Sequence, residues 1–313
     1  MNSNIKEDPI WDQIQNEGRI QMEQEPILAS FLHRVILRHP SFEQALAYLL
    51  AGKLEDQTLD ATTLMEVITE CFSEDPGIAL KSRKDIEAVA SRDPACDYFA
   101  QPLLFFKGYH ALQSQRISHQ LWHTGRKMLA LYLQSRISEV FAVDIHPAAK
   151  IGEGILLDHA TGIVIGETAE IGDDCMMYHG VTLGGTIWDK IKRHPTLKDG
   201  VVIGAGAKIL GPITLGNNVR VGSNSVVVKS IDDNCTVVGI PGRVLEQKVD
   251  DSDKFDFYAV STSGDESDPT VKAVKSIIEH LADIDKQLDK VSNAFCVSEE
   301  QEKIDSAVDG ENK

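Results

Sequence analysis

An aliphatic residue returns every six positions along most of the stretch from Ile145 to Asp232, and this repeat restricts the fold more than any other feature of the sequence. A period of six matches neither the turn of an α-helix nor the alternation of an ordinary strand. A fixed short repeat is typical of a β-helical solenoid, in which each coil buries its aliphatic residues only against neighbouring coils. The residues that begin the hexads are Ile145, Ile151, Leu157, Ile165, Ile171, Met177, Leu183, Ile203, Ile209, Leu215, Val221 and Val227.

The repeat is broken in two places. Its frame slips by two residues near Gly162 to Val164, and a longer interruption runs from Gly184 to Gly200. Insertions into a solenoid protrude as loops on one face, and loops held by a rigid scaffold often bear functional side chains. The interruption contains Trp188, Arg193 and His194. We therefore expect part of a functional site on this loop.

Motifs on the coils before this loop resemble those of a known family. VDIHPAAKIG begins at Val143, LDHATGIVIGETAEIG at Leu157 and VTLGGT at Val181, and an upstream segment begins RDPACD at Arg92. Together with the RHP that starts at Arg193, these strings resemble serine O-acetyltransferase, the enzyme that makes O-acetylserine for cysteine synthesis. A hexapeptide repeat alone would fit sugar acetyltransferases as well. The combination of motifs narrows the resemblance to one family, over roughly residues 8 to 247.

The resemblance implies an α+β fold, in which an N-terminal helical bundle precedes a left-handed parallel β-helix and a helical tail follows. Apolar residues at helical spacing, such as Ile117, Leu121, Met128 and Tyr132, support the first part. We predict a helical oligomerisation domain over residues 1–140, the catalytic β-helix over 141–247, a linker over 248–270 and an acidic tail over 271–313. In the family the helical domain joins two trimers, so the resemblance implies a homotrimer or a dimer of trimers.

Most of the net negative charge of the chain, −10 of −17, lies in residues 250 to 313. Residues 250 to 313 include 17 acidic residues against 7 lysines, and apolar residues repeat at three or four positions from Val271 to Val291. This spacing fits a short coiled coil or a docked helix, and equally a solvated amphipathic helix with a disordered end. Family members that bind O-acetylserine sulfhydrylase end in isoleucine, whereas this sequence ends DGENK. The resemblance therefore makes a complex with that enzyme doubtful.

The resemblance implies a reaction in which the hydroxyl of L-serine attacks the thioester carbon of acetyl-CoA. This attack needs a general base within hydrogen-bond reach of the hydroxyl, and we assign His159 of LDHATG to that role. A carboxylate on the other imidazole nitrogen would set the tautomer and stabilise the imidazolium. Asp144 lies 15 residues before His159, close to the 18 of one coil of three hexads, so we expect it beside His159. The alternative is a histidine that only stabilises the solenoid.

The amino-acid substrate is a zwitterion, so both of its charges need partners. Arg193 offers a planar fork that matches a carboxylate, and His194 lies beside it in the sequence. Asp158 and Asp93 stand where the family's amino-acid-binding aspartates stand, and would pair with the ammonium group. Taken singly, Asp93 could be a turn residue at a helix end and Asp158 a solvated coil position.

Acetyl-CoA is expected as a co-substrate, with no permanently bound cofactor. Gly184 and Gly185 allow close approach of the thioester, and their N–H groups are candidates to stabilise the oxyanion. Ala205 and Gly206 match the place where the family binds CoA, in a groove between neighbouring subunits. The CoA phosphates could meet three cations, although exposed cations on a solenoid are more often only solvated. These cations are Lys208, Arg220 and Lys229.

A metal site is the main alternative use of the remaining histidines. A hexapeptide carbonic anhydrase would need three histidines on one zinc ion, with an open fourth position. Cys175, His179 and His146 are the candidates, but His146 precedes Pro147 and more plausibly fixes the first turn of the solenoid. We expect no stoichiometric metal.

The composition fits a cytoplasmic enzyme. The net charge is −17, which argues against nucleic acid and anionic membranes as partners. The five cysteines are widely spaced without a CxxC pair, as in a reducing compartment. No apolar run reaches the length of a membrane span, and the polar start is unlike a secretory signal.

Two other functions stay open at this point. One is acetyl transfer to another small acceptor, such as homoserine or a sugar amine. The other is a non-catalytic trimeric scaffold that recruits partners, and the set of Asp144, His159, Arg193 and His194 argues against it. The resemblance also implies L-cysteine as a feedback inhibitor of serine acetylation.

Overall fold

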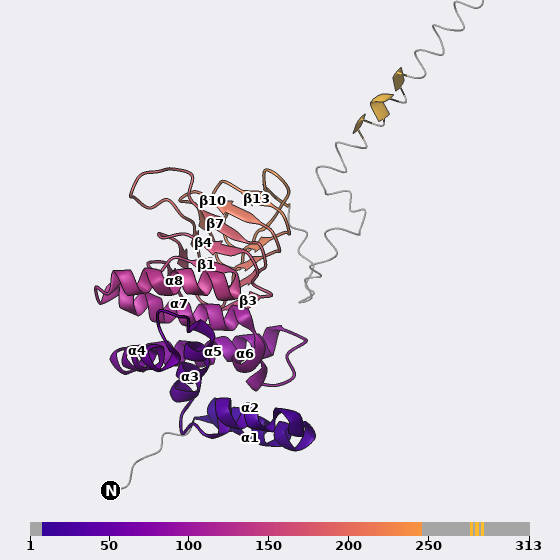
Figure 1. Cartoon of the computed structure of the whole chain (residues 1–313). Coiled ribbons are helices and arrows are strands. Elements are labelled where there is room, and N and C mark those ends of the chain that lie inside the picture. The colour runs from indigo at the N-terminus through magenta and orange to yellow at the C-terminus, as the bar shows by residue number, and fades with distance from the viewer. Residues whose placement is uncertain (1–7, 246–275, 278, 282, 285–313) are drawn as a thin grey trace, which may run out of the picture. The chain divides into compact units, whose positions relative to one another are not determined.

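The computed structural model describes residues 8–245, 276–277, 279–281 and 283–284. The chain divides into two compact units, residues 1–247 and residues 248–313. In the first unit helices come first in the sequence and a β-helix follows, with α7 and α8 alongside the first coil (Figure 1). The predicted α+β fold, a helical bundle followed by a parallel β-helix, is confirmed. The finer domain boundaries stay predictions.

Polar residues start several of the helices. The side chains of Asp8, Ser41 and Asp60 each accept a hydrogen bond from a backbone N–H of the first helical turn, which satisfies a donor that a helix start leaves unpaired. The helical elements are α1 (Pro9–Gln24), η1 (Pro26–Leu28), α2 (Ala29–Leu32), η2 (His33–Leu37), α3 (Phe42–Leu54), α4 (Ala61–Glu74), α5 (Gly77–Arg92), α6 (Ala100–Phe105), α7 (Lys107–His123) and α8 (Lys127–Phe141).

Three sheets form the walls of the β-helix. Sheet A has the order β1-β4-β7-β10-β13, sheet B the order β11-β8-β5-β2 and sheet C the order β15-β14-β12-β9-β6-β3. All pairs of named strands are parallel except β14 with β15. The strands are β1 (Val143–Ile145), β2 (Lys150–Ile151), β3 (Leu156–Asp158), β4 (Ile163–Ile165), β5 (Glu170–Ile171), β6 (Met176–Tyr178), β7 (Thr182–Gly184), β8 (Thr196–Leu197), β9 (Val202–Ile203), β10 (Lys208–Leu210), β11 (Thr214–Leu215), β12 (Arg220–Val221), β13 (Val226–Val227), β14 (Thr236–Val238) and β15 (Arg243–Val244).

The register of the coils explains both breaks in the hexad repeat. Val143 pairs with Ile163, 20 residues on, whereas Val164 pairs with Thr182, 18 residues on. The two extra residues of the first coil lie in the turn 159–162 between β3 and β4, so the frame slip is the turn that contains His159. The second break is the loop after β7, which protrudes from the third coil. The hexad residues face inward as predicted, with Met177 and Ile209 both 0% exposed.

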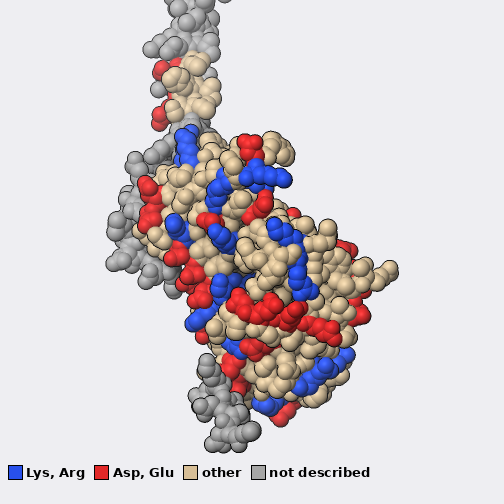
Figure 2. All heavy atoms as spheres, turned by 90° about the vertical axis from the view of Figure 1, so that its left-hand side faces the viewer, with Lys and Arg blue, Asp and Glu red and all other residues tan. Residues whose placement is uncertain are grey.

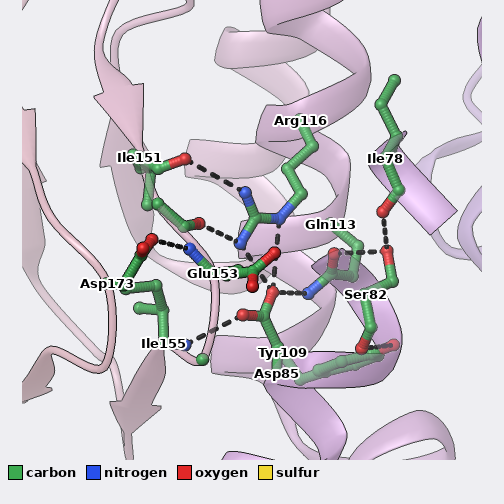
Figure 3. Close-up of polar contacts among 12 residues, drawn as sticks. Ile78, Ser82, Asp85, Tyr109, Gln113, Arg116, Ile151, Glu153, Ile155 and Asp173 are labelled. Atoms are coloured by element: carbon green, nitrogen blue, oxygen red, sulfur yellow. Dashed lines mark hydrogen bonds and ion pairs between the residues drawn. The ribbon is translucent and has the colours of Figure 1, made fainter. Parts of the chain in front are cut away.

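A buried ion pair joins the helices to the first coil (Figure 3). Asp85 of α5 and Arg116 of α7 are 0% and 5% exposed, and their Oδ2 and Nη2 atoms lie 2.7 Å apart. Asp85 Oδ1 accepts the N–H of Ile155 at 2.9 Å. Arg116 donates to the carbonyl oxygens of Ile151 and Gly152 at 3.3 and 2.8 Å. Each charged group therefore binds the β-helix as well as its partner.

Further polar groups complete this buried network (Figure 3). Gln113 donates from Nε2 to Asp85 Oδ2 at 2.9 Å, and its Oε1 accepts the hydroxyl of Ser82 at 2.7 Å. The Tyr109 hydroxyl donates to the Ser82 carbonyl at 3.1 Å. Buried ions cost much free energy unless they are paired and hydrogen-bonded, and this network supplies those bonds from both parts of the unit.

Two more contacts bring helices against the first coils. Arg92, the last residue of α5, donates to the carbonyl oxygens of Gly154 and Asp174 at 3.0 and 2.9 Å, and pairs with the Asp174 carboxylate at 2.5 Å. Gly108 in the first turn of α7 lies so close to β3 that an added Cβ would meet the Leu157 carbonyl oxygen at 2.0 Å. Only glycine therefore permits this approach of α7 to the turn after β3.

The described residues of the second unit belong to a helix, which lies within the predicted tail. Ile277, Leu281 and Ile284 are 59%, 55% and 48% exposed. The predicted linker over 248–270 and the end of the chain lie outside the described residues.

Charges of both signs are interspersed on the face of the molecule in Figure 2. This mixture differs from the continuous basic surface that nucleic-acid-binding proteins present. Over the residues that the structure describes, no helix combines the length and the apolar character needed to cross a membrane.

We predict that Asp85→Ala lowers the free energy of unfolding by about 3 to 5 kcal/mol, because it leaves the Arg116 guanidinium buried without a counter-charge. Urea unfolding followed by circular dichroism measures the change. Glu87→Ala is the matched control, since it removes an exposed pair with Lys84 in the same helix and should cost under about 1 kcal/mol. Equal effects of the two substitutions would contradict the anchoring role.

Candidate active site

The first group of predicted site residues, here called the acidic cluster, consists of Asp93, Asp158, His159 and His179. It lies at the edge where sheet C passes into sheet A, because β3 ends at Asp158 and β6 ends one residue before His179. His159 Nε2 lies 3.9 Å from Asp158 Oδ1, and the rings of His159 and His179 have centroids 5.9 Å apart. The structure thus brings the predicted base together with both predicted ammonium-binding aspartates.

The electrostatics of the acidic cluster centre on Asp158. Burial raises the pKa of its carboxyl group; the imidazoles of His159 and His179 lower it, whereas the negative charge of Asp93 raises it. The His159 side chain is 73% exposed and that of Asp158 only 21%. A half-buried carboxylate beside a second carboxylate favours a cationic ligand, because an ammonium group relieves both the burial and the repulsion.

The backbone at His159 is strained. His159 and Ala160 both have positive φ, 55° and 57°, which residues with a Cβ rarely adopt. Short backbone hydrogen bonds hold the turn, with Ala160 N–H to Asp158 O at 2.6 Å and Thr161 N–H to His159 O at 2.7 Å. Lys107 of α7 also donates to the Thr161 hydroxyl. Such strain persists where the surroundings impose it, and here it points the imidazole outward.

Asp93 reaches the acidic cluster from the helical part of the unit. It is the C-cap of α5, and its Oδ1 accepts the N–H of Ala95 at 2.9 Å, so it also serves as a turn residue. The contacts of Arg92 with the Gly154 and Asp174 carbonyl groups fix the end of α5 on the coils. Arg92 therefore positions Asp93, which the RDPACD string alone did not indicate.

The second group, here called the loop cluster, consists of His146, Glu167, Thr168, Arg193 and His194. It lies at the edge where sheet A passes into sheet B, since His146 follows β1 and His194 precedes β8. Arg193 Nη2 pairs with Glu167 Oε2 at 2.5 Å, and this pairing lowers the pKa of the Glu167 carboxyl group. The Thr168 hydroxyl accepts the N–H groups of Arg193 and His194 at 3.0 and 3.1 Å.

His194 is held in one tautomer. Its Nδ1 accepts the backbone N–H of Thr168 at 3.1 Å, which places the ring proton of the neutral form on Nε2. Burial, and then the charge of Arg193, lower the pKa of the imidazole, so it stays neutral near pH 7. The ring lies against Gly166 and Gly185, where added Cβ atoms would come within 2.0 and 3.4 Å of Nε2. His194 can therefore donate a hydrogen bond from Nε2.

Asp144 forms its hydrogen bond with Gln134 rather than with His159. On β1 of sheet A, its Oδ1 accepts a hydrogen bond from Gln134 Nε2 at 2.7 Å. Its charge raises the pKa of His146, although burial lowers that pKa more. Among the described residues no hydrogen bond joins Asp144 to His159, whose near neighbours are Asp158 and His179. The role of Asp144 as the partner of the base stays a prediction.

The predicted CoA contacts divide between the same two edges. Gly184 and Gly185 adjoin the loop cluster, whereas the turn with Ala205 and Gly206 stacks above the acidic cluster, where Gly206 N–H donates to His179 O at 2.8 Å. Lys208 donates to the carbonyl oxygen of Gly180 at this second edge. Lys229 lies beyond β13 of sheet A and Arg220 on sheet C, so the three cations do not converge within one chain.

The geometry gives no support to the alternative in which the histidines bind a metal ion. His146 Nδ1 accepts the N–H of Ala148 at 3.0 Å, which confirms that it stabilises the first turn of the solenoid. Cys175 is buried, which raises the pKa of its thiol to about 12. In the part of the chain that the structure describes, no three His, Cys, Asp or Glu side chains are grouped as a metal would need.

Comparison with known proteins agrees with the motifs. Residues 10–114 match the family model for the N-terminal part of serine acetyltransferase, and residues 194–229 match the bacterial transferase hexapeptide model. Serine acetyltransferase 2 of Arabidopsis thaliana is 45% identical over 89% of this chain and 82% of its own length. The serine acetyltransferase of Haemophilus influenzae is 50% identical over 76% and 89%. The chain belongs to the serine acetyltransferase family.

Solved serine acetyltransferases share the fold. The Neisseria gonorrhoeae enzyme in complex with serine has a TM-score of 0.73 at 47% identity, covering 77% of this chain and all of that one. Serine acetyltransferases in complex with cysteine and with CoA have TM-scores of 0.75 and 0.73, each at 50% identity. They cover 76% and 75% of this chain and 98% of their own.

We predict that Gly166→Ala in this serine acetyltransferase displaces His194, because the added Cβ would overlap the imidazole ring. The ring should then lose the hydrogen bond from Thr168, and its pKa, measured by NMR, should rise toward the ordinary value of 6.5. We expect KM for serine to rise roughly tenfold, because the loss of one hydrogen bond from His194 to the substrate would cost about 1.4 kcal/mol of binding free energy.

Gly52→Ala is the matched control, because a Cβ at Gly52 in α3 meets nothing within 4 Å. It should leave KM unchanged and stabilise the helix slightly. A normal KM for Gly166→Ala, with an unshifted His194 pKa, would show that the ring does not depend on this glycine.

Proposed function

We infer that this chain transfers the acetyl group of acetyl-CoA to the hydroxyl of L-serine, giving O-acetyl-L-serine and CoA, the first step of cysteine biosynthesis from serine. The observation that supports this reaction best is the separation of charge between the clusters. The acidic cluster offers carboxylates for an ammonium group, and the loop cluster offers Arg193 and a neutral imidazole donor for a carboxylate. A free α-amino acid carries both of these groups.

We propose that a complete site forms between two copies of the chain. In one chain the two clusters lie at opposite edges of sheet A, and no hydrogen bond or ion pair joins them within residues 8–245. The charges of serine are only a few bonds apart, so a single molecule needs both clusters close together. Packing sheet A edges of neighbouring copies in a cyclic trimer would place the acidic cluster of one copy beside the loop cluster of the next.

In this arrangement each residue has one task. Asp93 and Asp158 hold the ammonium group, while Arg193 and His194 hold the carboxylate, and together they orient the hydroxyl toward His159. His159 accepts the hydroxyl proton as the oxygen attacks the thioester carbon. The N–H groups of Gly184 and Gly185 stabilise the tetrahedral oxyanion, which then collapses and expels the thiolate of CoA.

L-cysteine carries the same ammonium and carboxylate groups as serine, so it occupies the same clusters and inhibits the enzyme.

A dimer of trimers is supported by the apolar face of the N-terminal helices, where Ile27, Leu28 and Phe105 are 87%, 40% and 58% exposed. Phe31 stacks on Phe105 in this face, with centroids 6.3 Å apart.

We propose a cytoplasmic location, supported by free thiols at all four cysteines within the described residues.

His159→Ala should lower kcat with L-serine roughly a hundredfold or more without changing the oligomeric state, since a positioned general base contributes about 10²–10⁴. Thiol release from acetyl-CoA measures the rate, with homoserine and glucosamine as competing acceptors for the wild type. His33→Ala, at an exposed site on the helical bundle, is the control and should be fully active. A tenth of wild-type kcat in His159→Ala would refute the assignment.

Co-expression of two inactive variants tests the shared site. His159→Ala disables the acidic cluster and Arg193→Ala the loop cluster, so random mixing in trimers should restore about a quarter of the wild-type sites. A mixture of His159→Ala with Asp93→Asn should restore none, because both substitutions lie in the acidic cluster. Absence of recovery in the first mixture would place each complete site within one chain.

A further inference from the structure

A pocket with a volume of about 280 Å³ lies where α5, α7 and the first coil meet. Its lining residues come from the turn before α5, from the two helices and from β2. None of them belongs to the acidic cluster or the loop cluster, so the pocket is separate from the candidate active site. The polar lining residues are Asp75, Lys81, Gln115, Arg116, His119, Gln120 and Lys150.

Arg116 lines this pocket with one N–H group still available. Its Nε and Nη2 atoms donate to Asp85 Oδ2, while Nη1 and Nη2 donate to the carbonyl oxygens of Ile151 and Gly152 (Figure 3). A guanidinium group has five N–H groups, so one on Nη1 remains for a ligand. Both paired faces of the fork are already occupied, which leaves no bidentate face for a carboxylate.

Lys81 gives the pocket a positive charge that no carboxylate balances. Its side chain is half-buried, and among the described residues no ion pair or hydrogen bond involves its ammonium group. Lys150 pairs with Glu170 at 3.1 Å, but Lys192 shares the same carboxylate at 3.8 Å. Four cations thus face three carboxylates, which leaves one positive charge with His119 neutral and two with it protonated. The cations are Lys81, Arg116, Lys150 and Lys192, and the carboxylates are Asp75, Asp85 and Glu170.

His119 supplies the second charge when it is protonated. Its Nδ1 donates to the Pro147 carbonyl oxygen at 2.7 Å, so Nε2 has no proton in the neutral form. Burial lowers the pKa of the imidazole, the bond to Pro147 raises it, and the charges of His123, Lys81 and Arg116 lower it. An anion in the pocket would favour protonation, which turns Nε2 into a donor. The other charged residues that line the pocket are Asp75 and Lys150.

We propose that this pocket binds a phosphoryl dianion, either free phosphate or the phosphate of a small ester, and binds it more tightly when His119 is protonated. Lysines bind phosphate as point charges, and the single N–H of Arg116 suits one oxygen of a tetrahedral group. A dianion also balances the two positive charges of the protonated pocket. The ligand contacts α5, α7 and β2 together, so it stabilises the junction that Asp85 and Arg116 hold.

Calorimetry of the full chain with inorganic phosphate, glycerol 3-phosphate and succinate tests the chemistry. We expect saturable phosphate binding with a Kd of about 1 mM or below, and succinate binding weaker by roughly tenfold or more. Tighter binding of glycerol 3-phosphate than of phosphate would assign the pocket to an ester, and the reverse to free phosphate. Absence of phosphate binding, or equally tight succinate binding, would overturn the proposal. Competition by CoA would do so too, because it would place the phosphate in the active site.

Substitutions of the lining lysines locate the bound anion. Lys81→Gln should weaken phosphate binding roughly tenfold or more because it removes the unbalanced cation, and Lys81→Arg should retain most of the affinity. Lys150→Gln, at an exposed position, should also weaken binding. Lys84→Gln is the matched control on α5, since Lys84 pairs with Glu87 and lies outside the pocket. Equal weakening by Lys81→Gln and Lys84→Gln would show only a general attraction to basic residues and would overturn the site.

Sulfate tests the part played by His119, because it is a tetrahedral dianion whose charge stays constant between about pH 6 and pH 8, whereas phosphate titrates in this range. Anion binding raises the pKa of His119 from its lowered value, so the complex takes up a proton and affinity rises as the pH falls. Wild type should bind sulfate severalfold more tightly at about pH 6 than at about pH 8, and His119→Gln should lose this dependence. A pH-independent affinity in wild type would overturn the role of His119.

Discussion

The ion pair between Asp85 and Arg116 is the constraint on which the site depends. It lies in a buried interface, where Asp85 accepts the N–H of Ile155 and Arg116 donates to the carbonyl oxygen of Gly152, both in the backbone of the first coil. A helix that moved away from the β-helix would break these hydrogen bonds, and one that moved away from the other helix would leave a charge without its partner, at a cost of several kcal/mol. This penalty holds α5 and α7 in place, and with them Asp93 at the end of α5 and the start of α7 against the turn of His159.

The solenoid arranges its chemistry by edges. Side chains on one edge stack at each coil, so residues separated by 18 or 20 positions become neighbours. One edge gathers carboxylates and imidazoles, and the other gathers Arg193 with the neutral His194. Because a rigid coil cannot fold one edge onto the other, we propose that a ligand with both charges binds between two copies. The assembly is thus part of the proposed chemistry.

The strength of sequence reasoning varied with the type of interaction. The inward hexad residues, the helical first part and the turn function of His146 followed from local pattern, and the structure confirms them. The ion pair of Glu167 with Arg193 spans 26 residues, and the bond of Gln134 to Asp144 links a helix to a strand. The string GETAE of residues 166–170, which contains Glu167, does not indicate such contacts. They form where the loop after β7 rejoins the coil and where the chain passes from α8 to β1.

The sequence by itself determined the β-helix, the loop within residues 184–200 and the family, because hydrophobic periodicity and short motifs are local features of the sequence. It also marked the turn of His159 as a slip of two residues in the repeat. Only the tertiary structure decided which residues meet. The position of α5 brings Asp93 near Asp158, and Asp144 accepts a hydrogen bond from Gln134. His179 lies between the turn of His159 and the turn of Ala205 and Gly206. These pairings depend on how separate coils and helices pack, and packing is a property of the whole fold.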